Sequence, residues 1–160
     1  MRHLYLIRHA EAANRLPHQT DLDRTLTAKG LKDAQRVGLY LREHKLERIY
    51  YSNAVRTTQT AFAINDALRL SHDSLVKSTA IYHADVITLL ELIQSIEEEV
   101  HFVAVVAHNP TVSALASELS IDRVPSFSPG QVVALAFEVD SWREVRPESS
   151  QLDFVYDPSK

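Results

Sequence analysis

The feature of this sequence that most restricts its fold is an uninterrupted apolar segment, Phe102–Ala107, in which three of six residues are β-branched. So short and apolar a segment is typical of a strand buried on both faces, as in a parallel sheet covered by helices. Similar segments at Leu4–Arg8 and Arg48–Tyr51 predict two more strands, and Leu75–Ser78 predicts a fourth. We therefore expect a sheet in which several strands run parallel.

Segments with helical spacing of apolar residues alternate with these strands. They begin near Leu31, Ala54 and Val86, and a further one follows Pro110. Asn109 can cap this last helix, and Pro110 fits its first position, where the missing N–H costs nothing. Strands that alternate with helices indicate an α/β domain with a largely parallel sheet.

The C-terminal part of the chain predicts the edge of the sheet. Val132–Val139 and Trp142–Val145 have the composition of closing strands, which could form a hairpin. Residues 147–160 are mostly polar, and we expect them to form a loosely held tail. The length of 160 residues fits one domain, which we expect to span residues 1–160.

Composition excludes several kinds of site and protein. The chain has no cysteine, so it can form no disulfide, thiolate nucleophile or thiolate zinc site. No two of its eight histidines lie within five residues of each other, and we expect no bound metal. The net charge of −4, without a run of basic residues, argues against nucleic-acid binding. Leu4–Ile7 is too short for a membrane span or a signal peptide, so we expect a cytoplasmic protein.

Arginine and histidine side chains stand where three of the predicted strands end. Arg8 and His9 end the first strand, His108 follows the apolar strand, and Arg56 lies in the first turn of the helix after the strand at 48–51. Ligands of open α/β sheets bind at the carboxyl ends of strands, so we expect these four side chains at one edge. Arginines bind phosphate through paired N–H groups, and a neutral imidazole can attack phosphorus. The sequence therefore predicts a phosphate site with a histidine nucleophile.

The motifs around these residues resemble those of the histidine phosphatase superfamily, which has a phosphoglycerate-mutase-like fold, and within it the small SixA-type phosphohistidine phosphatases. The matching segments are Leu6–Glu11 (Leu-Ile-Arg-His-Ala-Glu), Leu26–Gly30 (Leu-Thr-Ala-Lys-Gly), Ser52–Ala61 (Ser-Asn-Ala-Val-Arg-Thr-Thr-Gln-Thr-Ala) and Val106–Pro110 (Val-Ala-His-Asn-Pro). The resemblance implies a three-layer α/β/α domain with a mostly parallel sheet. It also implies that His9 forms a phosphohistidine intermediate without a cofactor. Arg8, Arg56 and His108 would then be catalytic residues that bind the phosphate.

One departure from the superfamily pattern concerns the general acid. Larger members place a glutamate or aspartate in the loop after the third strand, whereas Ala80–Asp85 contains no glutamate. Asp85 and His83 are the candidate acids in this segment. Cleavage of a P–N bond needs less help from an acid, because imidazole is a better leaving group than a sugar alkoxide. The departure favours phosphohistidine or another phosphoramidate as the substrate.

The polar segment Glu11–Lys29 predicts a functional loop. Asn14 in this loop is a candidate substrate-binding residue. Asp23–Arg24 resembles the Asp-x-x-Arg-x-Leu-Thr stretch of small superfamily members, with a slightly different spacing, and such a pair can anchor a loop. The loop is short by superfamily standards, and the resulting open site suits a phosphorylated protein side chain.

Three functions remain open at this point. The first is a phosphatase that removes phosphate from the phosphohistidine of a protein. The second is a broad-specificity phosphomonoesterase for small phosphorylated molecules, with His83 or Asp85 as its acid. The third is a non-catalytic module that binds phosphate or a phosphoprotein. A mutase fits least, since the enclosing insertions are missing, and we expect a monomer that binds neither nucleic acid nor membranes.

Overall fold

One mixed sheet forms the centre of the structure, a computed structural model that describes residues 1–160. Its strands are β1 (Arg2–Arg8), β2 (Arg48–Tyr51), β3 (Leu75–Lys77), β4 (Phe102–Ala107), β5 (Val132–Phe137) and β6 (Ser150–Tyr156). They follow the order β3-β2-β4-β1-β5-β6 across the sheet. The first four in this order pair in parallel, whereas β5 runs antiparallel to both β1 and β6. The predicted sheet with several parallel strands is confirmed.

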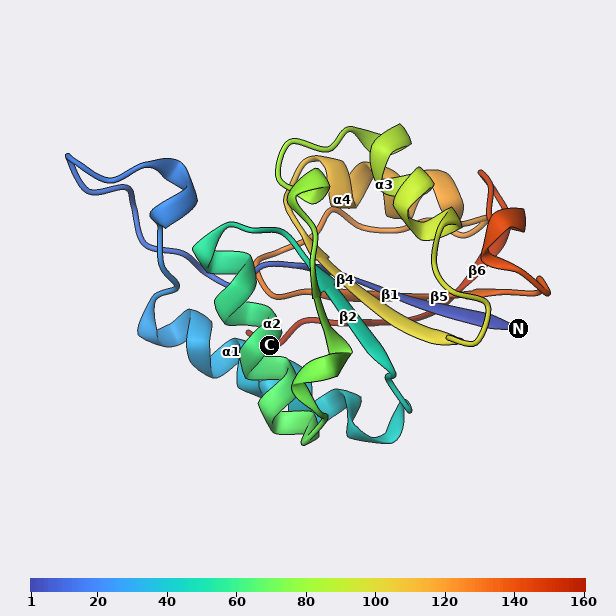
Figure 1. Ribbon diagram of the computed structural model, residues 1–160, viewed down its shortest axis with the longest axis horizontal. Helices are drawn as coiled ribbons and strands as arrows, with labels where there is room; N and C mark the ends of the chain where they lie inside the picture. The colour runs from blue at the N-terminus through green and yellow to red at the C-terminus, as the bar shows by residue number, and fades with distance from the viewer.

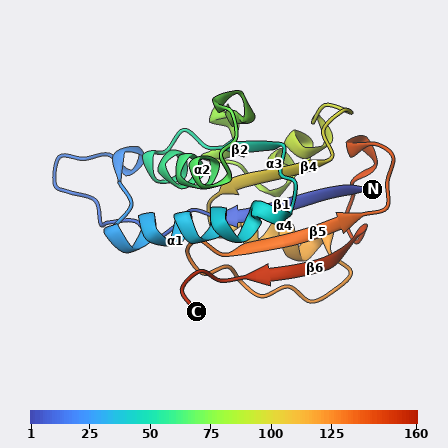
Figure 2. The same ribbon diagram turned by 90° about the horizontal axis from the view of Figure 1, so that it is seen from below.

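Helices cover both faces of this sheet, as Figures 1 and 2 show. The α-helices are α1 (Ala28–Tyr40), α2 (Val55–Leu68), α3 (Val86–Gln94) and α4 (Thr111–Leu119). Short 3₁₀ helices are η1 (Asp21–Asp23), η2 (Leu41–Glu43), η3 (His72–Ser74), η4 (Thr79–Ile81) and η5 (Trp142–Glu144). None of the helices combines the length and apolar character that crossing a membrane requires. α1 and α2 pack on one face and α3 and α4 on the other, which confirms the predicted three-layer α/β/α architecture.

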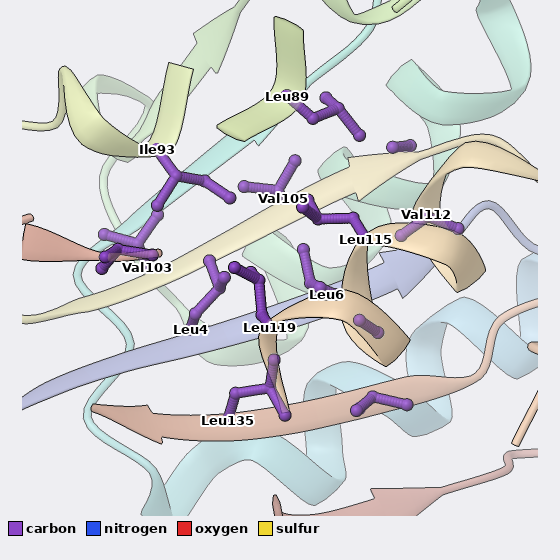
Figure 3. Packing of buried hydrophobic residues seen from close by; sticks show 14 of the residues in the cluster. Leu4, Leu6, Leu89, Ile93, Val103, Val105, Val112, Leu115, Leu119 and Leu135 are labelled. Atoms are coloured by element: carbon purple, nitrogen blue, oxygen red, sulfur yellow. The ribbon is translucent and has the colours of Figure 1, made fainter. Parts of the chain in front are cut away.

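The position of β4 explains its uninterrupted apolar sequence. Val103 and Val105 lie in the larger core cluster, against α3 and α4 (Figure 3). Ala104 and Val106 lie in the second cluster, with buried residues of α1 and α2. A strand between two helical layers has no side that faces solvent, so apolar residues do not alternate with polar ones.

The segment around Trp142 differs from the sequence prediction. Trp142 begins the 3₁₀ helix η5, whereas the sequence predicts a strand at Trp142–Val145. Its side chain is fully buried, and its indole Nε1 donates a hydrogen bond of 2.7 Å to the Val100 carbonyl. The apolar residues here are therefore core residues in a turn rather than members of a hairpin.

The expected loosely held tail is also wrong, because it contains β6. This strand pairs antiparallel with β5 and closes one edge of the sheet. Leu152, Phe154 and Tyr156 are half-buried and alternate with exposed residues. Such alternation is the pattern of a strand with one covered face, and it is easily missed among polar neighbours.

Asn109 precedes α4 but does not cap it, contrary to the prediction. Pro110 occupies the cap position, and no side chain caps the helix. The Asn109 amide instead donates to the Phe127 carbonyl (3.0 Å) and accepts from Ser113 Oγ (2.5 Å). Arg8 Nη1 donates to the same carbonyl over 2.9 Å, so Phe127 links the ends of β1 and β4.

Candidate active site

The four side chains predicted at one edge of the sheet do come together at the carboxyl ends of β1, β4 and β2. Neighbouring β1 and β4 are in register, with Arg8 opposite Ala107, so that His9 and His108 follow side by side. Their imidazole centroids are 5.5 Å apart. Arg56, in the first turn of α2, brings its Nη2 to 3.4 Å from Nδ1 of His108. Residues distant in the sequence therefore form one cluster.

The backbone and ring of His9 are held in one orientation. The His9 N–H donates to the Ala107 carbonyl (3.1 Å), and the His9 carbonyl accepts from the Gly130 N–H (3.0 Å). The ring Nδ1 lies 2.8 Å from the Ala10 carbonyl. A carbonyl oxygen only accepts, so Nδ1 carries the proton and Nε2 of the neutral ring keeps its lone pair.

The surroundings of His9 keep its imidazole neutral. Burial, together with the nearby charges of Arg56, Arg8 and Arg24, lowers its pKa from 6.5 to about 4, against the raising effect of its bond to Ala10. A protonated imidazole has no lone pair to attack phosphorus, so this environment preserves its nucleophilic form.

The pH dependence of the free energy of unfolding should reflect the neutral state of His9. Between its unfolded pKa of 6.5 and its folded pKa of about 4, the unfolded chain binds more protons. The free energy of unfolding is therefore expected to fall as the pH drops from about 7 to about 5. Urea unfolding at both pH values should show a smaller fall in His9→Asn than in the unmodified protein. An equal fall in both proteins would contradict a buried neutral His9.

His108 is held by a hydrogen bond at each nitrogen of its ring. Arg56 can only donate, so Nδ1 is the accepting nitrogen, and Nε2 donates to Ser52 Oγ over 2.7 Å. Ser52 is fully buried and also contacts Thr57 Oγ1 at 2.7 Å. Burial, followed by the charges of Arg56 and His9, lowers the pKa of His108 to about 3. An anion bound between the rings would favour the protonated form of His108 instead.

Two further residues at this edge, Asp21 and Tyr82, were not predicted from the sequence. Asp21 accepts from Arg56 Nη2 (3.0 Å) and Arg24 Nη1 (3.1 Å), and also from the Tyr82 hydroxyl. Asp21, not Asp23, is therefore the partner of Arg24, and the spacing Asp21-x-x-Arg24 could have identified it. Asp23 accepts a hydrogen bond from Thr20 instead. Nothing in the sequence around Tyr82 indicates its role.

Both arginines of the cluster have unused hydrogen-bond donors. The Nε atoms of Arg8 and Arg56 are buried and have no partner. Buried donors without acceptors are rare because each costs free energy. The Nε atoms of Arg2 and Arg48 are unpaired as well, away from this cluster. The free donors of Arg8 and Arg56 therefore indicate a site for an anion with several acceptor oxygens only in combination with the two imidazoles. No group of three or more histidine, aspartate or glutamate side chains is arranged to hold a metal.

Asn14 and Asp85 do not join this cluster, whereas His83 lies at its edge, where its charge contributes to the lowered pKa of His108. Asn14 is exposed in the loop before η1 and makes no hydrogen bond through its side chain. The Asp85 carboxylate caps α3 by accepting from Thr88 N over 2.8 Å, which lowers its pKa. His83 is exposed, with its ring 4.2 Å from that of Tyr82.

The cluster lies at the edge of the sheet, with His9 and His108 partly exposed and Arg56 buried, and no surface cavity encloses it. The surface cavities lie elsewhere, the largest in a groove between α1 and α2 that includes Leu39 and Phe62. His9, Arg56 and His108 line none of them. A bound group would therefore be held by side chains at its phosphate end and would project outward.

Known proteins resemble this chain in sequence and structure. Residues 4–77 match the model of the histidine phosphatase superfamily (branch 1). A protein from Nakamurella multipartitia assigned as a phosphohistidine phosphatase SixA has a TM-score of 0.84 and 27% identity, covering 99% of this chain and 97% of that one. A protein histidine phosphatase SixA complexed with tungstate has a TM-score of 0.82 and 23% identity, covering 98% and 97%. An uncharacterized protein of Mycobacterium leprae (strain TN) is 28% identical over 149 residues, in an alignment that covers 84% of this chain and 87% of that protein.

Proposed function

Because this chain belongs to the histidine phosphatase superfamily, we propose that its nucleophile is His9 and its substrate the phosphohistidine of a protein. The family match and the SixA-like structures support phosphatase activity as such. The fold is phosphoglycerate-mutase-like. The orientation and pKa of His9 support its role, since its unprotonated Nε2 is available at neutral pH.

The reaction has two steps that use the same nitrogen. In the first, Nε2 of His9 attacks phosphorus, and a new P–N bond forms as the P–N bond to the substrate imidazole breaks. The departing imidazole nitrogen takes a proton from solvent. In the second, water attacks the phosphorus of phospho-His9, which releases inorganic phosphate and returns the lone pair to Nε2.

The arginines and His108 would stabilise the charge of the phosphoryl group. The unpaired Nε–H groups of Arg8 and Arg56 supply donors for two of its oxygens. His108, protonated once the anion is bound, supplies a third. Charges fixed before the reaction stabilise a phosphoryl-transfer transition state without reorganisation, and no metal is required for that role.

The observation that carries the choice of substrate is that no hydrogen bond positions a proton-donating acid at the cluster: His83 is exposed and its ring makes none. Asp85 is engaged in capping α3, and Asp21 is held as a carboxylate with its pKa far below the usual range by Tyr82, Arg24 and Arg56. The pKa of Tyr82 is raised, mainly by its bond to Asp21, so that it is a poor proton donor. A sugar alkoxide leaving group needs such an acid, whereas an imidazole can leave without one. The lack of an enclosing surface cavity further favours a side chain presented by a protein over an enclosed small molecule.

Turnover of a matched substrate panel tests this proposal. We expect kcat/KM for a protein carrying phosphohistidine to exceed that for p-nitrophenyl phosphate and sugar phosphates by at least about 100-fold. His83→Ala and Asp85→Asn should each change turnover of phosphohistidine by no more than about threefold. Faster turnover of the phosphomonoesters, together with a large loss in either variant, would instead identify a phosphomonoesterase that uses an acid. Binding without any turnover would identify a non-catalytic module.

A further inference from the structure

The loop between β1 and α1 delivers a charged residue to the active site. This loop projects from the end of the sheet where β1 ends, as the dark blue segment in Figure 1 shows. Its base is fixed: Ala13 N donates to the Thr25 carbonyl (2.8 Å), and Leu26 N donates to Gln59 Oε1 (2.7 Å). η1 on its returning side carries Asp21, so the carboxylate is presented from a defined backbone.

Asp21 binds one particular edge of the Arg56 guanidinium. Its backbone carbonyl accepts from Nη1 (2.8 Å) and its carboxylate from Nη2 (3.0 Å), so Asp21 occupies the end of the guanidinium that these nitrogens form. The other edge consists of Nε–H and the second N–H of Nη2. Nη2 lies 3.4 Å from His108 Nδ1, and Nε is buried without a partner. On this edge Nη2 therefore lies against the imidazole of His108, and Nε–H is the donor that remains unoccupied.

Tyr82 holds Asp21 from the opposite layer of the molecule. It follows η4, and its hydroxyl donates to the carboxylate oxygen that also accepts from Arg56. The ring of Tyr82 meets that of His108 edge-on at 5.5 Å, and Arg56 Cζ lies 6.0 Å from its centre. The Arg56 side chain is only 7% exposed, against 47% for Asp21. The carboxylate thus lies at the rim and holds a guanidinium that reaches inward.

We propose that Asp21 is a positioning residue, which turns the Nε edge of Arg56 toward the phosphate and leaves its Nε–H free. This inference rests on the proposed phosphate site and adds the residue that orients it. A competing role for Asp21 would be to block the site by occupying Arg56 in place of phosphate. The contacts argue against blocking, because a carboxylate that mimicked phosphate would engage the unpaired Nε and does not.

The two roles predict opposite effects of removing the charge. Asp21→Asn keeps the size of the side chain but loses the charge that holds the guanidinium. We expect inorganic phosphate, measured by titration calorimetry, to bind about tenfold more weakly, and kcat to fall by a similar factor. Asp21→Glu retains the charge and should recover most of the affinity. Tighter phosphate binding in Asp21→Asn would overturn the proposal and identify a blocking carboxylate.

Asp23→Asn is the matched control, since Asp23 lies in the same turn but bonds only to Thr20 through its carboxylate. It should change phosphate affinity by less than about twofold, and equal effects of Asp21→Asn and Asp23→Asn would also overturn the proposal. If Asp21→Asn does not fold, Tyr82→Phe serves in its place, because it removes only the hydroxyl that donates to Asp21. It should weaken phosphate binding about threefold. An unchanged affinity in Tyr82→Phe would then overturn the proposal. Calorimetry with phosphate needs no turnover, so it separates failure of the Asp21 role from failure of the proposed substrate.

Discussion

Replacing His9 by alanine is expected to reduce turnover of a phosphohistidine protein by at least about 10⁴-fold, because no other group can accept the phosphoryl group. His108 cannot substitute for His9, since Ser52 engages its Nε2 and its Nδ1, which faces Arg56, is protonated when the anion is bound. Rapid-quench labelling with ³²P-phosphorylated substrate should place acid-labile label on the unmodified protein and none on His9→Ala.

His72→Ala provides the control for this experiment. His72 is exposed in η3, beyond the far end of α2 from the active site, and should be replaceable with unchanged turnover and labelling. Thermal unfolding should show that His9→Ala remains folded. Labelled phosphoenzyme in His9→Ala, or turnover close to that of the unmodified protein, would exclude His9 as the nucleophile.

Replacing Arg56 by lysine is expected to lower kcat/KM by about 10²- to 10³-fold although the charge is retained. Arg56 contacts Asp21 with two nitrogens while a third remains free for an anion. A single ammonium group cannot bind the carboxylate and the phosphate in these directions at once. Steady-state kinetics with the phosphohistidine protein would measure the loss.

Arg48→Lys is the matched change elsewhere in the protein. Arg48 begins β2, at the opposite end of that strand from Ser52. It is partly exposed and pairs with Glu97. Its replacement should leave kcat/KM within about twofold, as is usual for an exposed ion pair. If Arg56→Lys proved equally mild, positive charge alone would account for phosphate binding, and the directional contacts of Arg56 would have no role.

The sequence predicts most of the sheet because a buried strand is a segment of consecutive apolar residues. Phe102–Ala107 and Arg48–Tyr51 agree with β4 and β2 at both ends. The edge strand β6 was missed because only one of its faces is covered, which leaves three half-buried residues among polar ones. A buried aromatic residue in a turn looks the same in sequence as one in a strand, which is why the pattern around Trp142 predicts a strand.

The sequence likewise predicts some residues of the active site and not others. Arg8, His9 and His108 could be placed at one edge from strand ends alone, since parallel neighbouring strands end together. The contact between Asp21 and Tyr82 joins residues far apart in the sequence through two irregular segments, and no periodic pattern records it. The orientation of Arg56 follows from that contact, so it could only be seen in three dimensions.

The place of β4 between β1 and β2 has a consequence for how the protein reaches its active form. β1 and β2 are made early in synthesis but cannot be joined, because β4, which lies between them, is made last of the four parallel strands. A nascent chain that ends before Phe102 already contains Arg8, His9 and Arg56 but has no surface on which to align them. Such long-range pairing is typical of slow, cooperative folding. Catalytic competence should thus arise late and all at once, so regained turnover would report completion of the sheet.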